Sequence, residues 1–347
     1  MERLFIRADA NEKIATGHVM RCVAIAREFL IRGYEVCFLV ADQVSQKAVE
    51  AQGMSTILLN TRWDDMESEI PKVIAILRKY AASWLFVDSY YVTENYFREV
   101  RQWTKVAYVD DLHFFHYDCD AIINYSVYAS VFKYEDEYIH TRLLLGCDYV
   151  PLRSDFRDIS VHKICDTVTD VLLLTGGGDE YHVALKLVYE VMKHLYEWDD
   201  ITFHIVCGRF SPDREELERK AHELENIKIY SHVEHIEKLM QTVDIAISAG
   251  GSTLYELCAC GTPTITYSMA DNQLRNVKKF DQLGLMDYSG DVRDGFEYED
   301  LLKRLSELAD NCEKRAKQSR QTRQMVDGLG ARRIAEALSE ISGGVHR

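Results

Sequence analysis

Residues 248–256 read Ser248-Ala249-Gly250-Gly251-Ser252-Thr253-Leu254-Tyr255-Glu256 and follow the apolar run at 244–248. A second stretch, Thr16-Gly17-His18-Val19-Met20-Arg21-Cys22, comes after the apolar run at 4–7. Each glycine-containing turn is predicted to lead from a strand into a helix, where free backbone N–H groups and the helix dipole favour an anion. The earlier turn also holds a histidine, which can move protons near neutral pH. Together the turns indicate a cleft enzyme that acts on a phosphorylated ligand.

Strand-like and helical patterns alternate through nearly the whole chain. In the first part, strands are predicted at residues 4–7, 35–40, 85–87, 105–109 and 121–123. In the second part, they are predicted at residues 170–174, 201–207, 227–230, 244–248 and 264–267. This order predicts an α/β protein with two doubly wound, Rossmann-like domains facing an interdomain cleft. Ligands of such domains bind at the carboxyl ends of the parallel strands, hence in that cleft.

The length of 347 residues exceeds the size at which single hydrophobic cores stop growing, so two domains are expected. We place an N-terminal domain at residues 1–150 and a C-terminal domain at 168–325. Residues 326–347 carry a helical pattern and form a last helix that could pack back on the N-terminal domain.

Composition and charge exclude several classes of function. The net charge of −15 argues against binding to nucleic acid or to anionic membranes. No stretch approaches eighteen apolar residues, and the first residues lack a signal-peptide core. The nine cysteines show no zinc-ligand spacing, and free thiols in a reducing cytoplasm are expected. We expect a cytoplasmic monomer or weak dimer that uses no metal and no cofactor.

His18 follows Gly17 at the predicted start of a helix. The positive end of the helix dipole disfavours a protonated imidazole there, so the ring could act as a general base. From the spacing alone, a helix cap or a phosphate contact is an equally good interpretation. Asp9, at the end of the first strand, could orient the ring, bind substrate or serve as an ordinary turn residue.

Two glycine turns in the second part could hold phosphate. Gly250 and Gly251 allow close approach to the backbone, but Thr253-x-x-Glu256 also fits a capping box. Glu256 could therefore bond back to the cap or accept from a ribose diol. In the turn Thr175-Gly176-Gly177-Gly178-Asp179, three consecutive glycines favour phosphate or substrate contact over a simple tight turn.

Further polar residues follow predicted strands. Asp88-Ser89-Tyr90 and Asp110-Asp111 are expected at the same sheet edge. Adjacent side chains of a strand point to opposite faces, so the last two carboxylates are not expected to form an acid/base pair. Asn272 and Gln273 carry amides that suit sugar hydroxyls or acetamido groups, with an Asx-type turn as the alternative.

Together these residues resemble the family of UDP-2,4-diacetamido-2,4,6-trideoxy-β-L-altropyranose hydrolases of pseudaminic acid biosynthesis. The resemblance covers nearly the whole chain and rests on the segments Arg7-Ala8-Asp9, Thr16–Cys22, Val87–Tyr90, Asp110-Asp111, Thr175–Gly177, Ala249–Glu256, Gly261–Pro263 and Asp271–Gln273. The segment Thr16–Cys22 is specific to the hydrolases. The glycine-serine-threonine segment is shared with GT-B glycosyltransferases such as the lipid II-forming N-acetylglucosaminyltransferase.

The resemblance implies a GT-B fold and metal-independent, inverting hydrolysis at the anomeric carbon of a UDP-sugar, with UDP as the leaving group. His18 matches the histidine proposed to activate water, and Tyr90 and Asn272 match positions that contact the sugar. Gly251, Ser252, Thr253 and Glu256 fall on the UDP side. The remaining expected site residues are Asp9, Gly17, Arg21, Asp110 and Gln273 for the substrate, and Gly176 and Gly177 for UDP.

The chain departs from the family pattern at two positions. Ala15 stands where the family usually has glycine, and Ser89 where it often has histidine. Both flank the expected sugar pocket, so the sugar is less well defined than the reaction. Two other functions remain open: a GT-B glycosyltransferase that uses a UDP-sugar donor, and a non-catalytic UDP-sugar binding protein.

Overall fold

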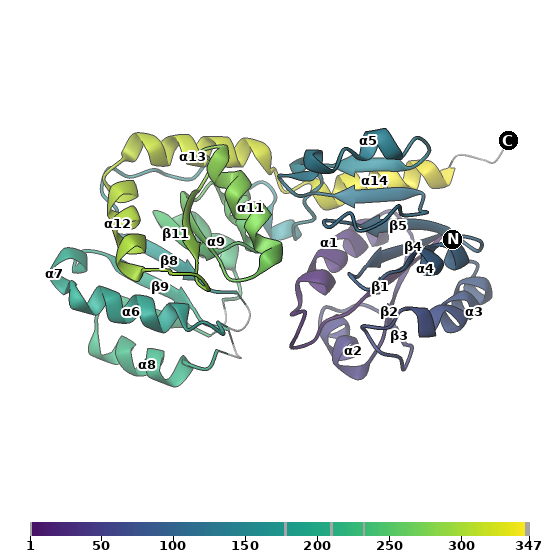
Figure 1. The fold of residues 1–347 in the computed structure, drawn as a ribbon, viewed down its shortest axis with the longest axis horizontal. Coiled ribbons are helices and arrows are strands. Elements are labelled where there is room, and N and C mark those ends of the chain that lie inside the picture. Colours follow the sequence, from purple (N-terminus) through teal and green to yellow (C-terminus); the bar gives the residue numbers. More distant parts are fainter. Residues whose placement is uncertain (1, 177–178, 209–210, 232, 344–347) are drawn as a thin grey trace. The chain divides into compact units, whose positions relative to one another are not determined.

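The computed structural model describes residues 2–176, 179–208, 211–231 and 233–343. The chain forms two compact units (Figure 1). One unit contains the residues up to Ser154 together with those from Gly328 onward, and the other contains Asp155–Asp327.

The first unit is built on a seven-stranded parallel sheet in the order β3-β2-β1-β4-β5-β6-β7. Its strands are β1 (Arg3–Ala8), β2 (Glu35–Val40), β3 (Thr56–Leu58), β4 (Trp84–Asp88), β5 (Lys105–Val109), β6 (Ala121–Asn124) and β7 (Arg142–Leu145). Its helices are α1 (Gly17–Ile31), α2 (Gln43–Glu50), α3 (Ile70–Tyr80), α4 (Glu94–Val100), α5 (Tyr134–Glu137) and α14 (Gly330–Gly343). Short 3₁₀ turns occur at η1 (Glu67–Glu69), η2 (Ala129–Phe132), η3 (Cys147–Tyr149) and η4 (Ser154–Phe156), the last at the boundary to the second unit.

Alternate residues of the central strands face two different hydrophobic clusters. Leu4, Ile6 and Phe86 are buried with Val19 and Val23 of α1, whereas Phe5, Leu85 and Val87 are buried with residues of α3 and α4. This alternation follows from the two-residue period of a strand. Continuous apolar runs were therefore the correct signal for central strands, because both faces are covered.

Helix α14 belongs to the first unit although it ends the described chain. Its residues Ala331, Ile334, Ala335 and Leu338 are buried in the same hydrophobic cluster as the inner face of α1. The Nζ atom of Lys105 donates to the backbone oxygen of Ile341 at 2.6 Å. The last helix thus covers the sheet beside α1.

The second unit has a six-stranded parallel sheet in the order β10-β9-β8-β11-β12-β13. Its strands are β8 (Asp170–Leu174), β9 (Thr202–Val206), β10 (Ile227–Tyr230), β11 (Ile245–Ala249), β12 (Thr264–Ser268) and β13 (Asp287–Asp291). Its helices are α6 (Val183–Lys193), α7 (Leu195–Trp198), α8 (Arg214–Glu223), α9 (Ile236–Thr242), α10 (Thr253–Cys260), α11 (Asp271–Gln282), α12 (Tyr298–Ala309) and α13 (Cys312–Met325).

The sequence analysis missed strands β3, β7 and β13, which form edges of the two sheets. Strand β13 reads Asp287-Tyr288-Ser289-Gly290-Asp291 and is half-buried throughout. An edge strand needs fewer apolar residues because one side is not covered by a neighbour. Composition alone therefore does not separate such a strand from a loop.

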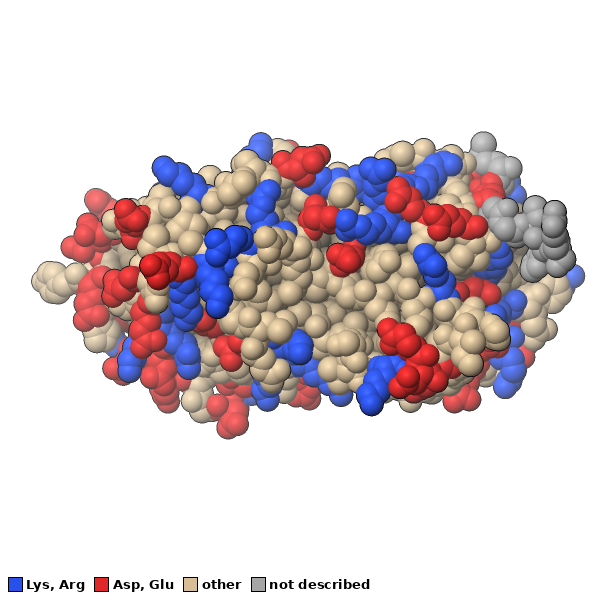
Figure 2. Space-filling view, turned by 90° about the horizontal axis from the view of Figure 1, so that it is seen from above, with Lys and Arg blue, Asp and Glu red and all other residues tan. Residues whose placement is uncertain are grey.

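The surface carries charges of both signs. On the face in Figure 2, acidic and basic side chains are interspersed and do not form one large basic field. None of the helices in the described part of the chain is both long and apolar enough to cross a membrane. The nine cysteines all lie in described segments, and no disulfide joins any two of them there.

Two neighbouring glycines make a matched test of the packing at the start of α10. A Cβ atom at Gly250 would lie 2.5 Å from Cγ1 of Val277, whereas a Cβ atom at Gly251 would meet no atom within 4 Å. We expect Gly250→Ala to lower the free energy of unfolding by about 1–3 kcal/mol through overpacking. Gly251→Ala should leave it unchanged or slightly raised, because alanine restricts the unfolded chain. Denaturant unfolding checks both, and equal effects would contradict the assignment of Gly250 to packing.

Candidate active site

His18 and Asp88 meet where helix α1 begins and strand β4 ends. His18 is the second residue of α1, and Asp88 is the last residue of β4. Asp88 pairs in register with Ala8 of the adjacent strand β1, so its side chain faces the same side as Ala8, the side that α1 covers. Parallel strands end at a common edge, and this edge of the sheet carries the candidate site.

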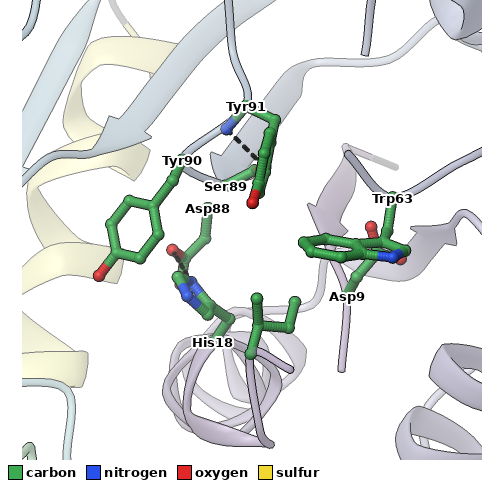
Figure 3. A pocket seen from close by; sticks show the side chains of 8 residues that line it. Asp9, His18, Trp63, Asp88, Ser89, Tyr90 and Tyr91 are labelled. Atoms are coloured by element: carbon green, nitrogen blue, oxygen red, sulfur yellow. Dashed lines mark hydrogen bonds and ion pairs between the residues drawn. The ribbon is translucent and has the colours of Figure 1, made fainter. Parts of the chain in front are cut away.

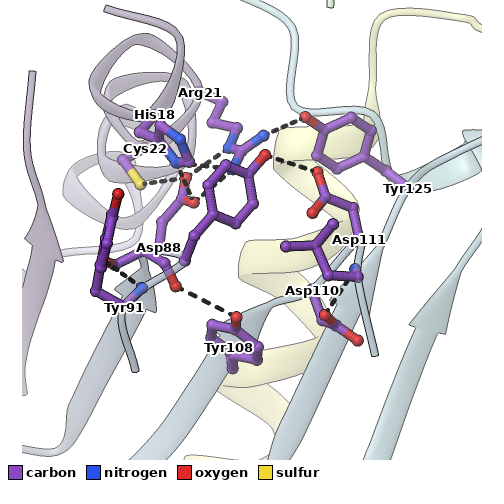
Figure 4. Close-up of polar contacts among 12 residues, drawn as sticks. His18, Arg21, Cys22, Asp88, Tyr91, Tyr108, Asp110, Asp111 and Tyr125 are labelled. Atoms are coloured by element: carbon purple, nitrogen blue, oxygen red, sulfur yellow. Dashed lines mark hydrogen bonds and ion pairs between the residues drawn. The ribbon is translucent and has the colours of Figure 1, made fainter. Parts of the chain in front are cut away.

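Asp88 binds both His18 and Arg21 through its carboxylate (Figure 4). Nδ1 of His18 lies 2.7 Å from Oδ1 of Asp88. Arg21, one turn later on α1, donates Nε to Oδ2 and Nη2 to Oδ1, both at 2.5 Å. Its Nη1 donates to the hydroxyl of Tyr125 at 2.6 Å. The three charged or titratable groups therefore form one buried cluster, which we call the His18–Asp88–Arg21 triad.

The electrostatics of the triad determine the tautomer of His18. Burial alone would raise the pKa of Asp88, but the Arg21 guanidinium and His18 hold it well below its usual range. Asp88 is therefore an ionised carboxylate that can only accept hydrogen bonds. Nδ1 of His18 lies 2.7 Å from this acceptor and 3.0 Å from the donor Nη2 of Arg21, and the shorter contact favours a proton on Nδ1, which leaves a lone pair on Nε2 when the ring is neutral. This is the form that a general base needs.

A small pocket opens beside the triad (Figure 3). It is lined by Asp9, Ile14, His18, Trp63, Asp88, Ser89, Tyr90 and Tyr91. In Figure 3, His18, Asp88 and Tyr90 lie on one side, and Trp63 and Asp9 lie on the other. The rings of Trp63 and Tyr91 meet edge to face with centroids 5.0 Å apart. The pocket thus combines a proton acceptor, carboxylates and aromatic surface.

Tyr90 connects His18 to a second carboxylate. Its ring meets the imidazole of His18 edge-on with centroids 4.9 Å apart, and its hydroxyl donates to Oδ2 of Asp111 at 3.0 Å. The other carboxylate oxygen of Asp111 is buried, and the described structure offers it no hydrogen-bond partner. Burial raises the pKa of Asp111, against the opposing charge of Arg21.

Asp9 has partners other than His18. Its Oδ2 accepts from Nη1 of Arg7 at 2.5 Å, and its Oδ1 accepts from the backbone N–H of Ala41 at 2.8 Å. Arg7 is fully buried and also donates to Glu69 at 2.7 and 2.9 Å. The suggestion that Asp9 orients the imidazole is therefore wrong, because Asp88 holds that place. Asp9 still lines the pocket, so its role in substrate binding stays a prediction.

The carboxylate of Asp110 accepts hydrogen bonds from groups of its own unit. It is buried and accepts from the backbone N–H groups of Leu112 and His113 and from the hydroxyl of Tyr117, each at 3.0 Å. The hydroxyl of Tyr134 donates to its other oxygen. These four donors leave Asp110 little capacity for the substrate contact that we expected of it, and Asp111 is the carboxylate on the side of His18.

The backbone conformation of the turn before α1 is one that suits the glycine expected at position 15. Ala15 has φ of 54°, in the left-handed region that favours glycine. A glycine would adopt this conformation without a Cβ penalty, whereas alanine carries strain there. Gly17 begins α1 with open space around its Cα, and Ser89 lines the pocket.

In the second unit, the turn after β11 leads into α10 as expected, but without a capping box. The helix begins at Thr253, so Thr253 is its first residue and cannot be its cap. Ser252 occupies the N-cap position, and its side chain makes no capping hydrogen bond. The capping-box interpretation is therefore wrong. The alternative role of Glu256 toward a ribose stays a prediction, as does UDP binding by Gly251, Ser252 and Thr253.

Helix α11 supports this turn. Nδ2 of Asn276 donates to the backbone oxygen of Gly250 at 3.3 Å, and Oδ1 of Asn276 accepts from the hydroxyl of Tyr255 at 2.8 Å. Gln273 accepts from the backbone N–H of Met269 at 3.0 Å, so its oxygen is used locally. Asn272 is exposed in the first turn of α11. The segment is therefore helical and does not form the Asx-type turn that we considered.

The helix that follows β8, α6, already has a carboxylate of this chain bound at its N-terminus. Oδ1 and Oδ2 of the buried Asp179 accept from the backbone N–H groups of Val183 and Ala184 at 2.8 and 3.0 Å. The start of α6 is thus already paired with a carboxylate. Gly176 has φ of 81°, a conformation that suits glycine, and Gly177 lies outside the described residues. Their predicted contact with UDP stays a prediction.

The structure thus brings His18, Tyr90 and Asp9 into the lining of one pocket of the first unit, and Arg21 binds Asp88 of the same lining. It places Gly251, Ser252, Thr253, Gln273 and Asn272 around the start of α10 and α11 in the second unit. The sequence analysis did not single out Trp63, Asp111 as a partner of Tyr90, or Tyr125 as a partner of Arg21. Trp63 lies in a segment without strand or helix pattern, so no periodicity could indicate it.

Comparisons with known proteins agree with this architecture. Residues 171–337, just under half of the chain, match the Glycosyltransferase family 28 C-terminal domain. The crystal structure of MurG from Acinetobacter baumannii superposes with a TM-score of 0.70 at 12% identity, over 98% of this chain and all of that one. The predicted GT-B-type pair of doubly wound α/β domains is thereby confirmed.

Two curated relatives are similar in sequence to parts of this chain. The spore coat polysaccharide biosynthesis protein SpsG of Bacillus subtilis is 26% identical over 227 residues, which cover 64% of this chain and 65% of that protein. The pseudaminic acid cytidylyltransferase and UDP-2,4-diacetamido-2,4,6-trideoxy-beta-L-altropyranose hydrolase of Helicobacter pylori is 25% identical over 272 residues, 78% of this chain and 45% of that protein. The chain therefore spans about half to two thirds of the length of these relatives.

The triad predicts how stability depends on pH. Asp88 has a lowered pKa in the folded state, so its contribution is present above the unfolded value of about 3.9 and is lost as pH falls below it. Asp88→Asn should lower the free energy of unfolding at pH 7 by about 3 kcal/mol, because Arg21 loses its buried partner. Stability of the variant should also change less between pH 5 and 3.

Asp64→Asn is the matched control, since Asp64 pairs with Arg62 at the surface at 2.9 Å. Urea unfolding at a series of pH values measures all three proteins. A parallel pH dependence of wild type and Asp88→Asn would contradict the buried ion pair.

Proposed function

We propose that this protein hydrolyses a UDP-linked diacetamido-trideoxy sugar at its anomeric carbon and releases UDP and the free sugar for pseudaminic (nonulosonic) acid biosynthesis. The observation that carries the proposal is the His18–Asp88–Arg21 triad, with the imidazole lining a pocket. Nδ1 is bound to an ionised carboxylate, so the lone pair of Nε2 is available for a proton from water. The resemblance and the Helicobacter pylori relative supply the substrate class.

The triad can perform the proton transfer without a metal. Nε2 of His18 takes a proton from water while the water oxygen forms a bond to C1 of the sugar. The bond from C1 to the β-phosphate oxygen breaks, and its electron pair leaves with UDP. Attack opposite the leaving group inverts the anomeric configuration. Asp88 stabilises the imidazolium that forms, and water or bulk solvent later removes its proton.

The second unit is proposed to bind the diphosphate. Backbone N–H groups and hydroxyls at residues 251–253 begin helix α10, whose dipole favours the negative charge that develops on UDP. Glu256 would accept from the ribose, and Asn272 and Gln273 would contact the sugar. Within the first unit, Tyr90 and Asp9 line the pocket beside His18 and are proposed to contact the same sugar.

A glycosyltransferase is the second candidate. The match of residues 171–337 to a glycosyltransferase family domain and the fold shared with MurG favour it. In that reaction His18 would take the proton from an acceptor hydroxyl in place of water. A UDP-sugar binding protein without activity is the third candidate. Such a protein would not need His18 as a general base.

One incubation separates these functions. We expect the protein, given only UDP-2,4-diacetamido-2,4,6-trideoxy-β-L-altropyranose, to release UDP and free sugar in equal amounts. In H₂¹⁸O the UDP must stay unlabelled, because the bond to carbon breaks and the bond to phosphorus does not. Proton NMR of the first product formed should show the inverted anomer. Turnover only after addition of a sugar or lipid acceptor would establish the transferase, and no turnover with saturable binding would establish the binding protein.

His18→Ala tests the base. We expect kcat to fall by about 10²–10⁴-fold, the usual contribution of general base catalysis. UDP binding, measured by titration calorimetry, should stay unchanged because the UDP residues lie on other elements. His222→Ala is the control, since this exposed histidine lies on α8 of the second unit. Near wild-type turnover by His18→Ala would refute the assignment.

A further inference from the structure

A second pocket lies in the second unit and shares no residue with the candidate active site. It has a volume of about 420 Å³, within the range of small-molecule sites. One wall comes from the segment before β8 and the other from helix α13. The pocket is lined by Val161, His162, Ile164, Ala316, Ser319, Arg320, Arg323 and Gln324. Apolar walls with a few polar groups are typical of sites for small organic ligands.

His162 is the unusual member of this lining. The residue is only 4% exposed, the Gln241 backbone lies within hydrogen-bonding reach of its ring, and at least one ring nitrogen is left without a partner among the described residues. Burial lowers the pKa of His162, while Asp244 and the Gln241 backbone act in the opposite direction. The neutral ring offers one N–H donor and one acceptor. Leaving such a nitrogen unpaired in the interior costs stability, so a ligand that pairs with it would bind favourably.

The charged residues of the pocket are all basic. Arg320 and Arg323 contribute to the lining, and no Asp or Glu does, in a chain whose net charge is −15. Arg323 is held in place because Nη2 donates to the backbone oxygen of Ile159 at 2.5 Å and Nη1 donates to that of Ser160. A guanidinium has five N–H donors, so further donors remain for a ligand. This pocket is locally suited to an anion although the chain as a whole is acidic.

The two walls also stand next to the places where the chain passes between its units. The chain leaves the first unit after Ser154 and returns to it after Asp327. Val161 and His162 follow the first passage closely, and Arg323 and Gln324 precede the second. A ligand that bridges these walls would therefore contact both segments that connect the units.

We propose that this pocket binds a small amphipathic anion, whose apolar body packs on Val161, Ile164 and Ala316 and whose anionic group meets Arg320 and Arg323, with His162 as an additional hydrogen-bond partner. The ligand class is an aromatic or alicyclic carboxylate, sulfonate or phosphate of nucleoside size. The site is separate from the proposed hydrolase centre and does not depend on it.

The test uses the full-length protein and 8-anilinonaphthalene-1-sulfonate as the probe, followed by fluorescence and titration calorimetry. We expect one saturable site. Arg320→Ala should weaken binding about tenfold and Arg320→Glu more, because a charge-assisted contact is removed or reversed. Arg320 is exposed, so these variants should fold normally. Arg304→Ala removes an equally exposed charge from α12 and should leave binding unchanged.

Two further binding measurements test which chemical groups of the ligand are recognised. N-phenyl-1-naphthylamine, the uncharged analogue, should bind more weakly and be insensitive to Arg320. His162→Gln should also weaken the sulfonate, with its thermal midpoint measured to confirm folding. Equal affinity of wild type and Arg320→Glu, or full displacement of the probe by UDP, would overturn the proposal, the second result because it would place the probe in the nucleotide site.

Discussion

The buried carboxylate of Asp88 is the constraint on which the candidate active site depends. An ionised carboxylate that is 1% exposed must be compensated by hydrogen bonds and opposite charge. His18 and Arg21 provide this compensation from successive turns of one helix, three residues apart. The start of α1 is therefore fixed relative to the end of β4 through charge as well as through apolar packing. The position of the catalytic candidate follows from how this charge is buried.

A second buried ionic network lies on the opposite face of the same sheet edge. Arg7 is fully buried between Asp9 and Glu69, and Thr61 also reaches Glu69. The network fixes the carboxylate of Asp9 on the side of η1 and α3. The two faces thus carry separate clusters, and the face toward α1 brings the imidazole of His18 to the pocket.

Strand periodicity explains which parts of the site could be predicted from the sequence. The apolar runs gave the central strands, and the glycine turns gave the starts of α1 and α10. Asp9 follows β1 and Asp88 ends the neighbouring strand β4, but the sequence does not contain the relative register of the two strands. Asp88 is level with Ala8, so Asp9 points to the other face.

Asp110 and Asp111 face opposite sides of the sheet for the same reason. Val109 belongs to the hydrophobic cluster of α1, whereas Tyr108 belongs to the aromatic cluster around Asp110. The alternation of adjacent side chains correctly predicted that the two carboxylates face opposite sides. It did not indicate which of them faces His18.

Arg21 gives the triad a property that a simple His–Asp pair lacks. A carboxylate that faces an imidazole alone stabilises the protonated ring and so works against a base that must be neutral before reaction. Arg21 binds both oxygens of Asp88 and offsets its charge, while Nδ1 of His18 keeps its hydrogen bond to Oδ1. The carboxylate then holds the ring in place through its contact with Nδ1. In the proposed hydrolysis, Nε2 accepts the proton of water, and the same three groups share the positive charge once it has been accepted.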